Sequence, residues 1–205
     1  MAATGVRATA TRARREAILR AALEVFLEAG VEGAAIEEIR RRSGASIGSI
    51  YHHFSGKEGI AAALYVEALR DYQEGALAAL EGSTSTRRGV MALVRHHLAW
   101  VASHPEQARY LLMGREPRVV LASERPLREL NRAFFDRVMD WVRPRVRRGE
   151  LRAISPDTVL AALWIGPSQE LSRHWLAGLL DEPLQDAAPA LAEAAWNALK
   201  KEDRR

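Results

Sequence analysis

Apolar residues recur along this chain of 205 residues at the spacing of amphipathic helices, and no stretch of any length alternates as a strand would. The first apolar stripe predicts a helix over about residues 12–29, which a glycine at position 30 ends. The pattern therefore predicts an all-α fold of about nine helices. Beyond two short helices within residues 36–57, a helix is expected over about residues 57–80. A polar break at 82–86 and a second break at 103–105 bound the next helix, and a short helix follows to residue 113. Further helices are expected over about 127–148, 156–178 and 184–200, with a loop or loosely helical connector at 114–126.

The segment IEEIRRRSGASIGSIYHHFSGK, residues 36–57, predicts two short helices joined by a tight turn. Gly44 supplies the turn, because a residue without Cβ adopts positive φ at little cost. Ser46 is placed to cap the second helix. A helix, a short glycine-containing turn and a second helix make a helix-turn-helix, whose second helix enters the DNA major groove. The apolar positions of that second helix are Ile47, Ile50, Tyr51 and Phe54.

The longer run GAAIEEIRRRSGASIGSIYHHFSGKEGI resembles the TetR family of bacterial transcriptional regulators. The resemblance lies in a glycine before the first short helix, a Gly-Ala-Ser turn, a Tyr-x-x-Phe recognition helix and a Lys-Glu pair that opens the next helix. It implies a basic arm and DNA-binding domain over residues 1–56, followed by a ligand-binding and dimerisation domain over residues 57–205. The chain departs from the family at Ala34 and Ala35, where a usual threonine pair would offer phosphate a hydroxyl.

The start of the recognition helix carries the candidates for reading base edges. Gly48 would let the backbone approach DNA closely, Ser49 can donate or accept a hydrogen bond, and Ile47 can contact a thymine methyl group. The resemblance implies that Tyr51, His52 and Lys57 hold the phosphate backbone, although Tyr51 would also suit packing beneath the two helices. The predicted DNA-binding set is Ser46, Ile47, Gly48, Ser49, Tyr51, His52 and Lys57.

The net charge of +4 comes from one end of the chain. Four of the 30 basic residues lie in residues 1–15, where there is no acid, and the remaining 26 match the 26 acidic residues. A floppy basic arm beside a helix-turn-helix fits contact with phosphate or the minor groove, and equally fits a solvated, disordered terminus. A second basic run, Arg40 to Arg42, follows Glu37 and Glu38, so we expect some of these arginines to form ion pairs.

All five tryptophans lie in the C-terminal region. Large aromatic side chains on several helices either line an apolar cavity or fill a core or a dimer interface. The family geometry implied by the resemblance places a pocket among the helices at 86–103, 127–148 and 156–178. The predicted pocket set is His97, Trp100, Met113, Phe134, Trp141 and Trp164.

His97 interrupts an apolar stripe, and His104 follows two turns later. This spacing separates the two rings by roughly 10 Å along a helix axis, too far to share one metal ion. We therefore predict no metal site and expect His97 to be a polar anchor in the pocket.

The resemblance also implies that the last two helices form a four-helix bundle with their copies in a second subunit. Apolar residues on these helices are the candidates for that homodimer contact. The predicted interface set is Leu160, Pro167, Leu171, Trp175, Leu191 and Leu199.

Together these features predict a DNA-binding transcriptional regulator, a repressor released from a palindromic double-stranded DNA operator by a small, mainly apolar effector. Two other classes stay open: a ligand-independent DNA-binding regulator, and an enzyme with an appended DNA-binding domain. The sequence has no nucleophile elbow, phosphate-binding glycine loop or zinc-protease motif, and no cysteine for thiolate chemistry. No apolar run approaches the roughly 18 residues of a membrane span, so we expect a cytoplasmic protein without cofactor or membrane partner.

Overall fold

The computed structural model describes the backbone of residues 2–113 and 117–202 and the side chains of residues 9–112 and 125–202. Within these ranges the backbone is helical or in loops, apart from one isolated antiparallel bridge between Leu151 and Lys200. The all-α prediction is therefore confirmed. The chain divides into unit 1, Met1–Ala68 with Arg109–Leu127, and unit 2, Leu69–Ala108 with Arg128–Arg205. No helix among the described residues is long and apolar enough to cross a membrane.

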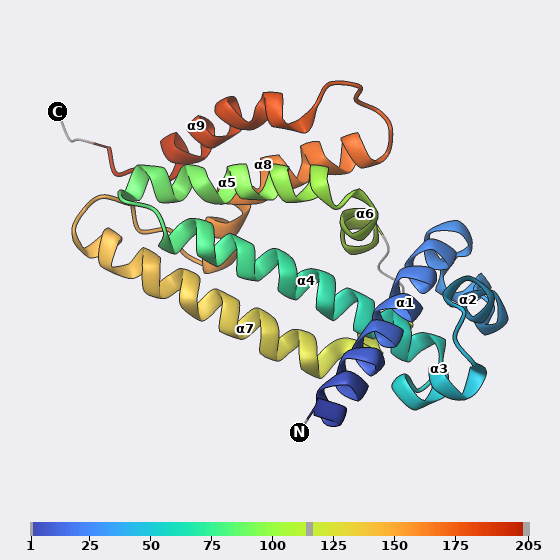
Figure 1. Ribbon diagram of the computed structural model, residues 1–205. Coiled ribbons are helices and arrows are strands. Elements are labelled where there is room, and N and C mark those ends of the chain that lie inside the picture. The colour runs from blue at the N-terminus through green and yellow to red at the C-terminus, as the bar shows by residue number, and fades with distance from the viewer. Residues whose placement is uncertain (1, 114–116, 203–205) are drawn as a thin grey trace. The chain divides into compact units, whose positions relative to one another are not determined.

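Unit 1 contains the helix-turn-helix and the helix that precedes it (Figure 1). Its helices are α1 (Ala2–Gly33), α2 (Ile36–Ser43), α3 (Ile47–His53) and the first part of α4 (Lys57–Glu81). Gly44, with a φ of 64°, ends α2 in the left-handed conformation that its position in the sequence predicts. α1 is broken at Gly30, where φ is 70°, but it begins at Ala2 rather than near residue 12. The basic N-terminal stretch therefore continues the helix, which corrects the expectation of a floppy arm.

The core of unit 1 is built from isoleucines that the helices bring together. Ile18 of α1, Ile39 of α2, Ile50 of α3 and Ile60 of α4 are all fully buried in it. Tyr110 of α6 (Pro105–Met113) joins this cluster, and its hydroxyl donates a hydrogen bond to the backbone carbonyl of residue 61 at 3.1 Å. The short helices α2 and α3 are thus held by tertiary burial.

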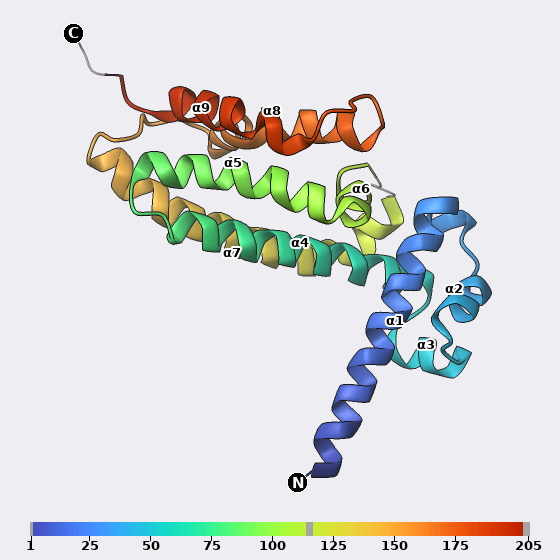
Figure 2. The same cartoon turned by 45° about the horizontal axis from the view of Figure 1, so that its top comes forward.

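Unit 2 contains the second part of α4 and the helices that follow it, except for residues 109–127, which belong to unit 1. α5 (Thr86–Ser103) lies against α8 (Asp157–Leu176) and α9 (Ala188–Leu199), and these helices run side by side in both views (Figures 1 and 2). α7 begins at Pro117, so the backbone is helical over much of the segment expected as a connector, of which residues 114–116 lie outside the described residues. The remaining elements are α7 (Pro117–Arg147) and the short 3-10 helix η1 (Leu184–Ala187).

A glycine sets the close packing between α5 and α7. A Cβ added to Gly89 would lie 2.3 Å from the ring of Trp141, which is shorter than any normal contact. Trp141 in turn packs near Trp164, with ring centroids 6.0 Å apart, and the indole N–H of Trp164 donates to the carbonyl of Val90 at 2.9 Å. The absence of a side chain at position 89 therefore lets Trp141 pack closely against α5, beside Trp164.

We expect Gly89→Ala to lower the free energy of unfolding by about 1–3 kcal/mol, because the new methyl group overpacks against Trp141. In an open helix the same change would stabilise the protein by up to about 1 kcal/mol. Gly48→Ala provides that control, since nothing lies within 4 Å of the added Cβ. Urea unfolding of both variants checks this; a Gly89→Ala protein as stable as the wild type would contradict the packing argument.

Candidate nucleic-acid interface and ligand cavity

α3 is fixed on one side and open on the other. The hydroxyl of Ser46 accepts a hydrogen bond from the backbone N–H of Ser49 at 3.1 Å, which confirms the predicted cap. Ile50 and Phe54 are buried in the core of unit 1. Since these contacts use one face of a seven-residue helix, its opposite face is left to solvent.

The open face of α3 carries the predicted base-reading and phosphate-binding side chains. Ile47, Gly48 and His52 are exposed, and Ser49 is half-buried. Tyr51 is 57% exposed, so it does not pack beneath the two helices. The structure therefore brings these residues to one accessible surface, and their contacts with DNA stay a prediction.

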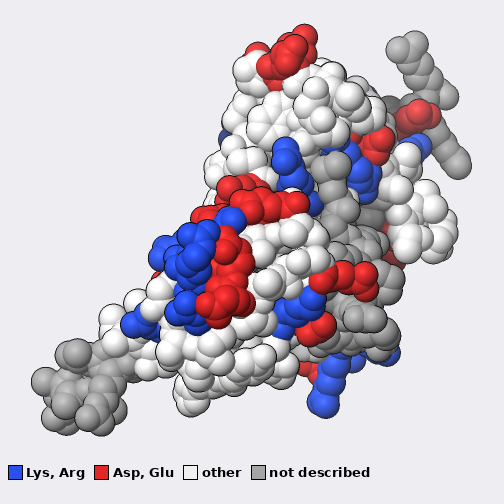
Figure 3. Space-filling model, turned by 90° about the vertical axis from the view of Figure 1, so that its right-hand side faces the viewer, with Lys and Arg blue, Asp and Glu red and all other residues white. Residues whose placement is uncertain are grey.

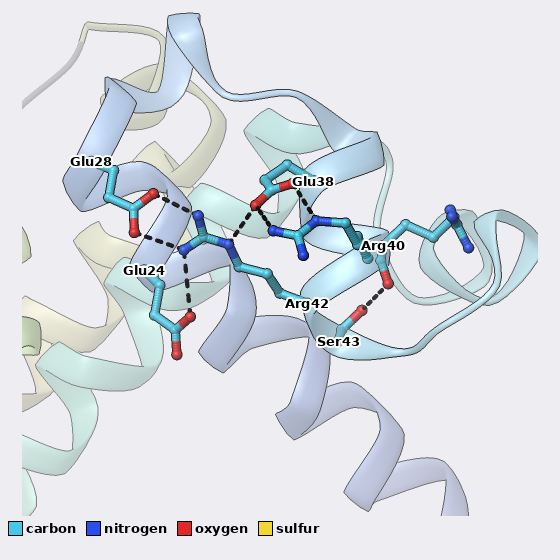
Figure 4. A network of polar contacts seen from close by, with 7 residues as sticks. Glu24, Glu28, Glu38, Arg40, Arg42 and Ser43 are labelled. Carbon is cyan, nitrogen blue, oxygen red and sulfur yellow. Dashed lines mark hydrogen bonds and ion pairs between the residues drawn. The ribbon is translucent and has the colours of Figure 1, made fainter.

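Arg42 fastens α2 to α1 (Figure 4). Its guanidinium donates to both carboxylate oxygens of Glu28 on α1, at 2.7 and 2.6 Å, and to Glu38 on α2 at 2.7 Å. Glu24, one turn before Glu28, lies 3.6 Å from the same guanidinium. Two parallel hydrogen bonds to one carboxylate are the strongest geometry available to arginine, so Arg42 is committed to holding the helix-turn-helix together.

The other two arginines of this run are paired within α2. Arg41 donates to both oxygens of Glu38, and Arg40 donates to Glu37 at 2.7 Å. Hydrogen bonds from Arg41 and then Arg42 lower the pKa of Glu38 to about 2. Figure 3 accordingly shows basic and acidic side chains interleaved on this side of the molecule instead of an uninterrupted basic patch. The expected ion pairs are confirmed.

The N-terminal arginines also contact the protein. Arg12 lies 3.6 Å from Glu16, and Arg15 pairs with Glu67 while its guanidinium sits 5.3 Å from the centroid of the Phe54 ring. Arg14 is exposed, and its Nη1 donates to the carbonyl of Gly44 at 3.1 Å. Because Gly44 is the turn before α3, Arg14 places a positive charge beside the recognition helix. The side chain of the remaining arginine of this stretch, at position 7, lies outside the described residues.

Lys57 has a structural role that the sequence does not indicate. Its ammonium donates to the carbonyl of Glu32 at 2.6 Å and lies 3.4 Å from that of Ala34. It therefore ties the start of α4 to the link between α1 and α2. The phosphate contact of Lys57 stays a prediction, and we expect its substitution to disturb this link as well as to remove a charge.

Arg14 and Arg42 offer a matched pair of substitutions. We expect Arg14→Ala to weaken binding to all DNA sequences and to reduce the salt dependence of binding by about one unit, because one phosphate contact is lost. Arg42→Ala should lower the midpoint of thermal unfolding and change the salt dependence much less. DNA titrations at several salt concentrations, with thermal melts, check both. The reverse assignment would show that Arg42, not Arg14, contacts phosphate.

Unit 2 contains a cavity of about 400 Å³ between α4, α5, α7 and α8. Its wall is mostly apolar, with aliphatic side chains from these helices between the aromatic rings. Aromatic residues are supplied by three of the helices and polar residues also by three. The aromatic lining residues are Tyr72, Phe134, Phe135 and Trp164, and the polar ones are Gln73, Asn131, Asp157 and Gln169.

Of the predicted pocket set, Phe134 and Trp164 line this cavity, whereas three others do not. Trp141 is buried against Gly89, beneath the guanidinium of Arg145 at 3.6 Å. Trp100 is buried with its indole N–H donating to Asp71 at 2.7 Å. These tryptophans are core residues, and the side chain of Met113 lies outside the described residues.

His97 does not line the cavity, but it contacts Tyr72, which does. Its Nδ1 lies 3.1 Å from the hydroxyl of Tyr72, and its Nε2 lies 3.2 Å from the hydroxyl of Ser172. Burial, reinforced by the neighbouring His96, lowers the pKa of His97 to about 4, so the ring is uncharged at neutral pH. It is a buried polar anchor, as expected, but it anchors Tyr72 instead of facing the cavity.

The predicted dimer residues divide into two groups. Pro167 is exposed, and Leu171, Trp175 and Leu191 are half-buried, so a partner can reach them. Leu160 and Leu199 are only 6% and 1% exposed, which corrects their assignment. Leu160 lines the cavity instead. Helical periodicity alone does not separate the face packed within the subunit from the face left over.

The residues that the sequence reasoning missed are the cavity's amides. Gln73 and Asn131 lie on α4 and α7, far apart in the chain, and they bond to each other at 2.9 Å. One signal was available: Gln73 occupies a core position of α4, with Ala76, Leu77 and Leu80 following on the same buried face. A polar residue in an apolar stripe is the kind of departure that marks a site.

Comparison with known proteins agrees with this arrangement. The model of the family "Bacterial regulatory proteins, tetR family" matches residues 18–64. The transcriptional repressor AcnR of Corynebacterium diphtheriae is 30% identical over 72% of this chain and 73% of its own length. The transcriptional regulator RutR of Escherichia coli is 27% identical over 78% of this chain and 75% of its own.

Solved structures share the fold. The regulator FadR from Bacillus subtilis, in complex with stearoyl-CoA, superposes with a TM-score of 0.76 at 17% identity, covering 89% of this chain and 98% of that one. The exposed recognition helix of unit 1, in a chain that also has a second helical unit, defines a DNA-binding transcriptional regulator of the helix-turn-helix class. Given the match to AcnR and to the family model, the chain belongs to the TetR family of bacterial regulators.

Proposed function

We propose that this chain is a repressor that binds a palindromic operator as a homodimer and is released when a mainly apolar ligand enters the cavity of unit 2. The observation that supports this proposal is the cavity, because its volume of about 400 Å³ falls in the range of roughly 300–1,000 Å³ typical of small-molecule sites. The protein acts on cytoplasmic DNA and catalyses no reaction.

The surface of α8 and α9 supports a homodimer. Val159, Leu163 and Pro167 are exposed on α8, and Ala190 and Ala194 are exposed on α9. A two-fold contact would cover these apolar groups with their own copies, and the small alanines allow a close approach of helices. A two-fold dimer presents two α3 helices, so its operator should be palindromic.

α4 supports a path from ligand to DNA. Leu69, Tyr72 and Gln73 of this helix line the cavity, while Lys57 at its first position is bonded to the carbonyl of Glu32 in unit 1. A ligand shifts an equilibrium only by its differential affinity for two conformations. We infer that the bound ligand favours a displaced α4 and thereby alters the separation of the two recognition helices.

The relatives add support of two kinds. AcnR is described as a repressor, which favours repression over activation. FadR holds stearoyl-CoA, which favours a lipophilic effector for a helical unit of this fold. A ligand-independent regulator is the competing function, and the experiment below separates the two.

We expect a lipophilic compound that binds the wild-type chain to weaken its affinity for the operator at least about fivefold, the low end of usual allosteric coupling. The operator would first be selected from random DNA by the protein, and two chains should bind each palindrome. Acyl, aromatic and cationic lipophiles would then be titrated against the complex. Operator affinity indifferent to every compound that binds would favour the ligand-independent regulator.

Ala161→Phe provides the matched variant, because Ala161 lines the cavity on α8 and the larger side chain fills it. The variant should bind the operator with an affinity that no longer responds to the active compound. Ala99→Phe, on the exposed side of α5, is the control and should respond as the wild type does. A normal response of Ala161→Phe would place the effector elsewhere.

A further inference from the structure

The lining of the cavity in unit 2 includes a buried amide whose oxygen has no hydrogen-bond partner among the described residues. Gln73 is only 5% exposed and lines the cavity from α4. Its Nε2 donates to Oδ1 of Asn131 on α7 at 2.9 Å. Its Oε1 is buried and has no hydrogen-bond partner among the described residues. A buried acceptor without a partner destabilises a protein. A ligand that donates a hydrogen bond to this oxygen would therefore gain binding free energy.

The other polar groups of the aromatic wall are already occupied. The indole N–H of Trp164 donates to the carbonyl of Val90 at 2.9 Å, and the hydroxyl of Tyr72 lies 3.1 Å from Nδ1 of His97. The indole of Trp164 therefore has no donor left for a ligand, and the hydroxyl of Tyr72 already has one partner. Polar recognition of a ligand therefore depends mainly on the amide side chains of the lining, above all on that of Gln73.

The charges of the lining residues also restrict which charge the ligand can have. The described lining residues include no lysine and no arginine, and their one acid, Asp157, is exposed. An anionic group taken into the cavity would lose water without gaining a cation. A cationic group would lose its hydration and gain only the neutral amide of Gln73 as a partner. An uncharged polar group suits this lining best.

We propose that Oε1 of Gln73 accepts a hydrogen bond from the hydroxyl or N–H group of an uncharged, mainly apolar effector. This inference rests on the proposed function of the cavity as the effector site. The cavity of about 400 Å³ compares with about 30 Å³ for each water molecule in the liquid, so the effector has on the order of a dozen non-hydrogen atoms.

Three naphthalenes of this size test the proposal by isothermal titration calorimetry on the full chain at pH 7. 2-Naphthol carries a hydroxyl donor, 2-methoxynaphthalene has the same ring system without a donor, and 2-naphthoate is an anion. We expect 2-naphthol to bind about tenfold or more tightly than the ether, because only the hydroxyl satisfies Oε1. The anion should bind most weakly.

Gln73→Met removes the acceptor and keeps the length of the side chain. It should retain the affinity for 2-methoxynaphthalene, which shows that the cavity is intact, and lose the preference for 2-naphthol. Gln185→Met is the matched control, because Gln185 is exposed on η1 and is not among the residues that line the cavity. This control should keep the preference.

Several results would overturn the proposal: equal binding of 2-naphthol and its ether by the wild type, tightest binding by 2-naphthoate, a preference that survives in Gln73→Met, or no binding of 2-naphthol at millimolar concentration. Operator titrations with 2-naphthol separate this inference from the proposed function. A preference that depends on Gln73, together with unchanged operator affinity, would uphold the donor site and reject release by this ligand.

Discussion

The burial of Ile39 and Ile50 against α1 is the interaction on which the DNA-binding surface depends. α2 and α3 have only eight and seven residues, and helices this short do not persist alone in water. Tertiary burial, the left-handed turn at Gly44 and the cap at Ser46 together hold α3 with one side in the core. The exposure of Ile47 and Tyr51 on the other side is a consequence of that anchoring, so we expect loss of the core to remove the predicted DNA-reading surface as well.

Several charged side chains around this core are already bonded within the protein, so they stabilise the fold. Arg42 bridges α1 and α2 through Glu28 and Glu38, and Lys57 bonds to carbonyls at the end of α1. Phosphate attracts any nearby cation, but a cation already bonded to a carboxylate gains less by turning to it. We therefore expect the contribution to DNA affinity to come from cations such as Arg14, which keeps most of its donors while one is bonded to the carbonyl of Gly44.

Local features of the fold could be predicted from the sequence, whereas the arrangement of helices from distant segments could not. The Ser46 cap and the Gly44 turn depend on neighbouring residues, and both are present in the structure. Trp141 was expected in the pocket, but it packs against Gly89, a partner more than fifty residues away in the chain. The bond between Gln73 and Asn131 was missed for the same reason. Helical periodicity identifies a buried face without showing what that face packs against.

The central claim is that α3 reads DNA while the ion pairs of Arg42 keep holding it in place. A structure of the full chain bound to its selected operator tests this most directly. The account predicts α3 in the major groove, with Ile47 and Ser49 at base edges and Arg42 still bonded to Glu28. An α3 that lies outside the groove, or an Arg42 that leaves Glu28 to bind phosphate, would contradict it.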